Sequence, residues 1–263
     1  MTAGADRRTL AEQFEALGLA AGDIVLVQAS MRQVAPRSAR AATVVEALLD
    51  VLGPAGTIIV PTYTSWNSTS SRAHREAVAE LTPQEADAYR LSLPAFDPCV
   101  TASSGMGALA ETIRTLPGAH RSTHPQTSFA AVGRHADSLT TIHDLACHLG
   151  ERSPLGALYA ADALVLLLGV GYDVCTAFHL AEYRYAPRVP RPYECRIAGL
   201  PGDGWTTFDD IELDDSEFGL IGKEFETAGG PVRTGRTGET DSLLFPLRAA
   251  VDFAENWMRR FAA

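Results

Sequence analysis

Apolar residues along the first sixty positions recur with two different spacings. Between residues 9 and 19, and again between 43 and 52, they lie three or four positions apart, which is typical of a helix with one buried face. The run 24–27 is continuously apolar, as in a buried strand, and residues 57–60 predict a second short strand. Because a helix separates these two strands, the pattern predicts a parallel strand–helix–strand unit.

A second unit of this kind lies beyond the middle of the chain. Residues 163–169 predict a buried strand, and a Gly-Val-Gly turn leads from it into a helix predicted over 174–184. Residues 128–132 predict a further strand, and 247–261 predict a closing helix with one apolar face. The alternation predicts an α/β fold with a mixed central sheet flanked by helices.

Two segments interrupt this alternation. Residues 61–101 are rich in Ser, Thr, Pro and aromatic residues, and this segment is too long for an inert connection, so we expect a functional excursion there. From about 187 to 240, proline and glycine separate short predicted strands. Residues 203–226 contain nine acids and a single basic residue, Lys223. We therefore expect one domain over 1–263, with a smaller β-rich acidic subdomain near its C-terminal third.

Composition adds a charge argument. The 263 residues include 32 acids and 22 bases, for a net charge of −10, and 46% are hydrophobic. The hydrophobic share excludes wholesale disorder, and the negative charge argues against nucleic acid and for a cationic partner. The longest apolar run, 163–170, is too short to span a bilayer, so we expect no membrane segment. The four cysteines lie far apart, which is typical of a protein in the reducing cytoplasm. The histidines lack the helical spacing of metal ligands, so we expect no metal.

The strongest candidate chemistry follows the strand 163–169, at the strand end where ligands collect in α/β sheets. Thr176, His179 and Glu182 are three positions apart and share one face of the predicted helix. Asp173, at the helix mouth, is close enough to turn back towards His179. An imidazole between two acids is suited to general-base catalysis. The spacing alone leaves open that His179 only packs the helix.

Three further sites are candidates for ligand contacts. The segment 122–128 combines hydroxyl side chains with a histidine just before a predicted strand. The simpler interpretation is that these hydroxyls only form hydrogen bonds to the backbone of their own turn. Ser153 precedes Pro154 at a helix start, where free N–H groups suit an anion. Arg32 follows the first strand and suits a phosphorylated ligand, while a solvated loop is the simpler interpretation.

Taken together, five segments in order along the chain resemble the aminoglycoside 3-N-acetyltransferases, which differ in fold from the GCN5-related acetyltransferases. The similarity spans nearly the whole chain. The segments are LVQASMR at 26–32, LGPAGTIIVPT at 52–62, STHPQTSFAAVG at 122–133, GERSPL at 150–155, and LLGVG at 167–171 continuing to TAFHLAE at 176–182.

This resemblance implies acetyl-CoA as donor, the 3-amino group of a 2-deoxystreptamine antibiotic as acceptor, and antibiotic resistance as the outcome. It places His179 at the family's catalytic histidine, oriented by Asp173 or Glu182, with Thr176 or a nearby N–H group facing the developing oxyanion. The residues expected at acetyl-CoA are Ser30, Arg32, Thr123, Ser153 and Leu155. Those expected at the antibiotic are Tyr63, Trp66, Asp97, Asp209, Asp210, Asp214, Asp215 and Glu217.

Some alternatives stay open at this stage. Gln28 stands where the family often has histidine, which weakens the inference at that position. The five acids between 209 and 217 would attract a polycationic sugar, although charged runs usually only face water. The same scaffold would also suit another amino-bearing metabolite, or a binder of cationic antibiotics without catalysis. The sequence predicts no oligomeric state.

Overall fold

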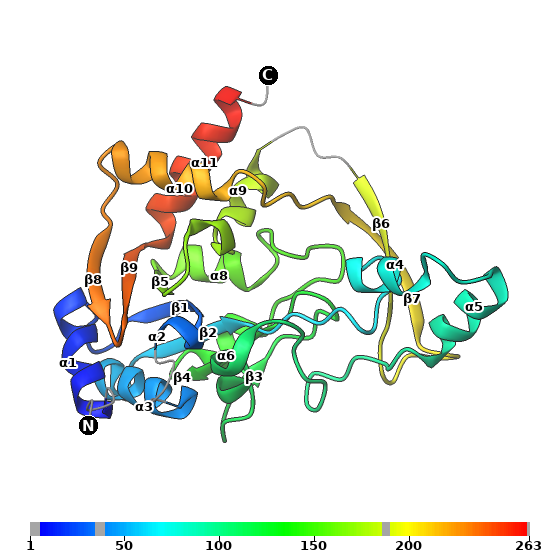
Figure 1. The fold of residues 1–263 in the computed structure, drawn as a ribbon, viewed down its shortest axis with the longest axis horizontal. Helices are drawn as coiled ribbons and strands as arrows, with labels where there is room; N and C mark the ends of the chain where they lie inside the picture. Colours follow the sequence, from blue (N-terminus) through cyan, green and yellow to red (C-terminus); the bar gives the residue numbers. More distant parts are fainter. Residues whose placement is uncertain (1–5, 35–39, 186–189, 262–263) are drawn as a thin grey trace.

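A seven-stranded mixed sheet forms the centre of the computed structural model, which describes residues 6–34, 40–185 and 190–261 (Figure 1). Its order is β3-β4-β2-β1-β5-β9-β8. Strand β1 is parallel to both β2 and β5, and the remaining pairs are antiparallel. The strands are β1 (Ile24–Ala29), β2 (Thr57–Pro61), β3 (His120–Arg121), β4 (Phe129–Gly133), β5 (Leu164–Leu168), β8 (Arg233–Thr237) and β9 (Thr240–Pro246). The predicted parallel unit at the start of the chain is confirmed.

Helices cover both faces of this sheet, and the strands alternate their side chains between two hydrophobic cores. Leu26 and Val165 belong to one core, while their neighbours Val25 and Leu166 belong to the other. The first core includes residues of α7 (Ala136–Thr140), α8 (Pro154–Ala160), α9 (Phe178–Arg184), α10 (Phe218–Thr227) and α11 (Leu247–Phe261). The second includes residues of α1 (Arg7–Leu17), α2 (Met31–Val34), α3 (Ala41–Leu52) and α6 (Gly107–Arg114). The predicted fold class is confirmed.

A separate two-stranded hairpin, β6 (Pro190–Arg196) and β7 (Trp205–Ile211), lies beside α4 (Arg72–Val78) and α5 (Pro83–Ser92) (Figure 1). The Glu194 carboxylate of β6 accepts hydrogen bonds from Thr69 at 2.7 Å and from Arg90 at 2.6 Å. Isolated bridges also pair Ser68 with Cys195 and Phe96 with Ile197. The predicted excursion 61–101 is therefore packed against the hairpin.

Two details differ from the sequence-based expectations. The helix predicted over 174–184 begins only at Phe178, because residues Tyr172–Val174 form a separate 3₁₀ turn and Cys175 is extended. Within 187–240 the described residues also contain helix α10, and β8 joins the central sheet through β9. Residues 187–189 of that segment lie outside the described ranges.

Candidate active site

The candidate site begins where the parallel strands β1 and β5 end side by side. The backbone N–H of Ser30, just after β1, donates to the carbonyl of Leu168 at 2.9 Å. The Gln28 amide spans the gap to the segment that follows β5: its oxygen accepts from Thr176 N–H at 3.0 Å, and its nitrogen donates to the carbonyl of Val174. Strand β1 thus fixes the segment that leads into α9.

His179 and Glu182 lie one turn apart on α9 and are hydrogen bonded. The distance from His179 Nδ1 to Glu182 Oε2 is 2.5 Å, and the two side chains are only 13% and 12% exposed. The second Glu182 oxygen accepts from the backbone N–H of Asp214 at 2.8 Å. The ring of Phe218 meets the imidazole edge to face, with centroids 4.7 Å apart. Since a carboxylate only accepts, it holds the Nδ1–H tautomer and leaves Nε2 as the proton-accepting nitrogen.

The other two predicted catalytic residues lie apart from this pair. Asp173 is exposed in the 3₁₀ turn, and within the described residues no hydrogen bond joins it to His179. Thr176 precedes the helix, so the expectation that it shares a helical face with His179 and Glu182 is wrong. Its side chain lies beside the buried Tyr63 hydroxyl, whose pKa is raised by burial and partly lowered by Thr176.

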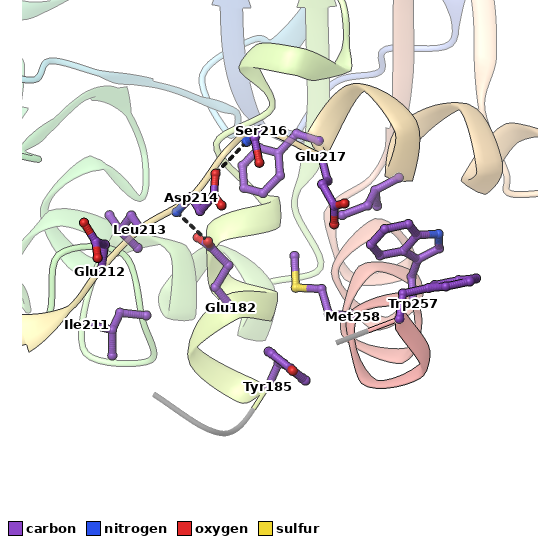
Figure 2. A pocket seen from close by; sticks show the side chains of 13 residues that line it. Glu182, Tyr185, Ile211, Glu212, Leu213, Asp214, Ser216, Glu217, Trp257 and Met258 are labelled. Atoms are coloured by element: carbon purple, nitrogen blue, oxygen red, sulfur yellow. Dashed lines mark hydrogen bonds between the residues drawn. The ribbon is translucent and has the colours of Figure 1, made fainter. Parts of the chain in front are cut away.

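A cavity of about 590 Å³ opens next to Glu182, between the segment 211–218, helix α10 and helix α11 (Figure 2). Its described lining includes no basic residue and four acids: Glu182, Glu212, Asp214 and Glu217. The backbone N–H of Ser216 donates to Asp214 Oδ1 at 3.0 Å, and this bond keeps the pKa of the Asp214 carboxyl below its ordinary value. Tyr185, Trp257 and Phe261 add an aromatic wall. His179 does not line the cavity itself, but its hydrogen-bond partner Glu182 does.

The five acids predicted as one wall occupy three different environments. Asp214 and Glu217 line the cavity. Asp209 and Asp215 are exposed but do not line it. Asp210 is 8% exposed and binds His148 and Tyr183, so its assignment to a solvent-facing wall is wrong. The reason is the alternation of β7, which turns Asp209 outwards and Asp210 inwards.

The residues predicted to contact acetyl-CoA are likewise divided between surface and core. Arg32 and Thr123 are exposed, and within the described chain Arg32 makes no ion pair. Ser153 is 1% exposed and caps α8, because its hydroxyl accepts from Leu155 N–H at 3.2 Å. The Leu155 side chain is fully buried in the core.

The remaining residues predicted at the antibiotic are Tyr63, Trp66 and Asp97. Trp66 is 56% exposed. The Asp97 carboxylate accepts from Cys99 N–H at 2.8 Å and therefore stabilises its own turn. The Tyr63 hydroxyl is buried and has no hydrogen-bond partner among the described residues.

Two features around the site were not predicted from the sequence. Gln28 was noted only as a departure from the family, because sequence spacing does not show that its amide reaches residues 174–176. A cluster of three buried histidines, His124, His143 and His148, was missed as well. The only sequence signal was the hydroxyl-rich segment that contains the first of them.

The described residues contain neither a metal-binding cluster nor a membrane-spanning helix. No group of three or more His, Cys, Asp or Glu side chains there is arranged to hold a metal ion. Within the same ranges, no helix combines the length and apolar character that crossing a membrane requires.

A mixed α/β sheet with a histidine–carboxylate pair after a parallel strand, beside an acid-lined cavity, defines an enzyme suited to a cationic substrate. The family model for aminoglycoside 3-N-acetyltransferases matches residues 26–259, and the chain belongs to this family. The resemblance drawn from the sequence motifs is thereby confirmed.

Individual relatives agree over nearly the whole chain. It is 36% identical over 255 residues to the SPbeta prophage-derived aminoglycoside N(3')-acetyltransferase-like protein YokD of Bacillus subtilis, which covers 95% of this chain and 91% of the relative. It is 34% identical over 257 residues to aminoglycoside N(3)-acetyltransferase III of Pseudomonas aeruginosa, covering 95% and 92%.

Solved structures share the fold. The crystal structure of YokD has a TM-score of 0.91 at 34% identity and covers 100% of this chain and 96% of its own. AAC-IIIb in a binary complex with CoASH has a TM-score of 0.83 at 30% identity, covering 97% of each chain. AAC-VIa bound to sisomicin has a TM-score of 0.81 at 30% identity, covering 98% and 99%.

Proposed function

We propose that this chain transfers the acetyl group of acetyl-CoA to the 3-amino group of a 2-deoxystreptamine aminoglycoside, with His179 as the general base. The observation that carries the proposal is the His179–Glu182 pair beside an acid-lined cavity. Family membership supports the reaction and the resistance role. The relatives solved with CoASH and with sisomicin support the two substrates.

The pair provides a base with one defined free nitrogen. Glu182 accepts the Nδ1 proton of His179, and the Asp214 N–H group fixes the carboxylate from its other side. When Nε2 takes a proton from the acceptor ammonium, the adjacent carboxylate stabilises the imidazolium that forms. Glu182 is therefore the orienting acid in this proposal, and Asp173 is not.

The acylation then proceeds by direct attack. The deprotonated amine forms the N–C bond to the thioester carbonyl, and the C–S bond breaks. Of the two protons that the ammonium nitrogen loses in all, one passes through His179 to the departing sulfur and the other is released to solvent. The Thr176 hydroxyl is the donor for the developing oxyanion, because the Thr176 N–H is already bound to Gln28. No acyl-enzyme is required.

The acid-lined cavity would hold the remaining ammonium groups of the acceptor. Glu217 makes no side-chain hydrogen bond or ion pair within the described residues, so its charge is free for a ligand. Glu212 shares its charge with Arg191 at 3.1 Å. Acetylation turns an ammonium into a neutral amide, so the product should bind these acids less tightly than the substrate.

The donor side also fits, although with fewer residues than predicted. The buried Tyr63 hydroxyl lies beside Thr176 but makes no hydrogen bond of normal geometry within the described residues, so a ligand oxygen at this place would satisfy it. Arg32 is exposed just beyond β1 and suits a phosphate. Ser153 and Leu155 support α8 from within and are indirect contributors in this proposal.

A thiol-release assay with acetyl-CoA and an aminoglycoside panel tests the function. We expect turnover with wild type, and a loss of about 10²- to 10⁴-fold in kcat for His179→Gln, because that is the usual contribution of a positioned base. Binding of sisomicin, measured by calorimetry, should survive this substitution. Absence of thiol release from wild type with every aminoglycoside would contradict the proposal, and so would unchanged kcat in the variant.

A further inference from the structure

Asp210, at the penultimate position of β7, is a buried carboxylate with four hydrogen-bond donors. Its Oδ2 atom accepts from His148 N at 2.6 Å, His148 Nδ1 at 2.7 Å and the Tyr183 hydroxyl at 2.6 Å. Its Oδ1 atom accepts from Ile211 N at 2.8 Å. Burial acts to raise the pKa of Asp210, but the hydrogen bonds from His148 and Tyr183 outweigh it and keep the pKa below its ordinary value.

The other nitrogen of His148 also faces an acceptor. Its Nε2 lies 3.0 Å from the amide oxygen of Gln126. The Gln126 nitrogen points the other way and donates to Ser68 Oγ at 2.8 Å, and that hydroxyl donates to the Glu194 carbonyl. His148 therefore lies between Asp210 and Gln126, and the side chains of His148 and Asp210 are only 3% and 4% exposed.

This carboxylate joins elements that surround the candidate active site. Tyr183 follows Glu182 directly on α9, and the residues after Asp210 lead to Asp214, whose N–H group binds Glu182. Two hydrogen bonds, Asp210 to Tyr183 and Asp214 to Glu182, therefore attach one short segment to adjacent residues of one helix. Figure 2 shows the second of these bonds, with the segment 211–217 passing over α9.

We infer that Asp210 is a positioning residue for the acetyl transfer: its bond to Tyr183 sets segment 211–214 against α9, so that the Asp214 amide holds Glu182 and Glu182 holds His179. The inference rests on the proposed function. It assigns Asp210 no contact with either substrate. Asp210 therefore contributes to orienting the base, and the exposed acids of the cavity contribute to binding the acceptor.

Kinetics with acetyl-CoA and sisomicin separate positioning from simple support of the fold. Asp210→Asn should lower kcat by about tenfold or more, since a small misplacement of a catalytic group costs up to about 10²-fold. The KM for acetyl-CoA should stay within about twofold of wild type, because none of its predicted contacts touches Asp210. The matched control is Asp203→Asn, which removes the same charge at the opposite end of the hairpin and should leave kcat within about twofold.

A double-mutant cycle tests whether the effect passes through Glu182. If it does, adding Asp210→Asn to Glu182→Gln lowers kcat no further. If Asp210→Asn does not fold, Tyr183→Phe gives the same test, because it leaves the His148–Asp210 pair intact. Its loss of kcat should be smaller, and it should likewise disappear in the Glu182→Gln background. Losses that multiply in either cycle would overturn the inference, as would wild-type kcat in folded Asp210→Asn protein.

A readout independent of turnover keeps this inference distinct from the proposed function. In proton NMR, the hydrogen-bonded Nδ1 proton of His179 should give a downfield resonance in wild type and in Asp203→Asn. It should be lost in Glu182→Gln and in Asp210→Asn. If wild type shows no acetyl transfer, the proposed function fails, and this resonance still decides the inference: its persistence in Asp210→Asn would refute the positioning role.

Discussion

Acids that are neighbours in this sequence have different physical roles, and local geometry decides which role each one takes. Asp210 is enclosed by hydrogen-bond donors, and Asp214 caps the turn at Ser216. Glu217 lines the cavity and has no side-chain hydrogen bond or ion pair within the described residues. An enclosed carboxylate has little electrostatic attraction left for a ligand, because its donors already neutralise it. Glu217 therefore should contribute most to attracting a cationic acceptor.

Glu217→Gln is expected to raise the acceptor KM by about three- to tenfold at low salt, which corresponds to roughly 1 kcal/mol for one partly exposed charge pair. The kcat should change little, since Glu217 touches neither His179 nor Glu182 in the described structure. The measurement is steady-state kinetics with sisomicin at two salt concentrations.

The matched control for this prediction is Asp209→Asn, which removes the same charge outside the cavity. Its effect on the acceptor KM should be smaller, and added salt should suppress the Asp209→Asn effect more completely than the Glu217→Gln effect, because a distant exposed charge is screened more than a contact inside the cavity. Equal effects of the two substitutions would show that only the net charge of the molecule matters.

At the scale of elements, the segment between β5 and α9 depends on a residue that is distant in sequence. Gln28 accepts from Thr176 N–H and donates to the carbonyl of Val174, so one planar amide satisfies two backbone groups that precede the helix. Without it these groups would lack partners, and the segment would gain freedom.

Gln28→Ala is therefore expected to lower kcat/KM by about tenfold, since a loosened segment misplaces both Thr176 and the start of α9. Amide exchange at Thr176 should accelerate in the same variant. Gln28→Glu keeps the acceptor but places a carboxylate against the Val174 carbonyl, so its loss should be at least as large.

The control for the Gln28 substitutions is Gln84→Ala, an exposed glutamine on α5 that should leave both measurements unchanged. Normal exchange at Thr176 in Gln28→Ala would show that the hydrogen bonds to Gln28 do not restrain the segment.

The elements differ in how far the sequence predicts them. The central strands and the last helix follow from strong apolar periodicity, and their observed bounds are close to those expected. The start of α9 was misplaced because Val174 and Cys175 fit the helical pattern, while the tertiary contact with Gln28 holds them outside the helix. The sequence also does not show which face of β7 is buried. Asp209 and Asp210 look equivalent until it is known that the face carrying Asp210 packs against His148.

The candidate site shows the same division. His179 and Glu182 are three positions apart on one helix, so their contact is local and the sequence predicts it. The links of Asp214 to Glu182 and of Asp210 to Tyr183 join positions 32 and 27 residues apart, and no motif records such separations. The cavity wall from α11 depends on the packing of the last helix against α9 and α10, which only the whole fold determines.

At the scale of the molecule, the buried histidine cluster makes stability depend on pH. His143 bonds to Ser122 Oγ and to the carbonyl of His148, and burial lowers its pKa to about 4. Burial also holds the pKa of His124 well below its ordinary value. Both rings are therefore neutral in the folded protein at pH values where the unfolded chain protonates them.

The sign of the effect follows from proton binding. Between pH 6.5 and 4 the unfolded chain binds more protons at these two positions than the folded chain does, so the free energy of unfolding falls as the pH falls. For His143 alone, with an unfolded pKa of 6.5 and a folded pKa of about 4, the loss of unfolding free energy from pH 7 to pH 5 is about 2 kcal/mol.

Urea unfolding at several pH values measures how steeply the free energy of unfolding depends on pH. In His143→Gln, which keeps a donor and an acceptor but does not titrate, the slope should flatten by the same amount. An unchanged slope would mean that His143 already carries its proton in the folded molecule.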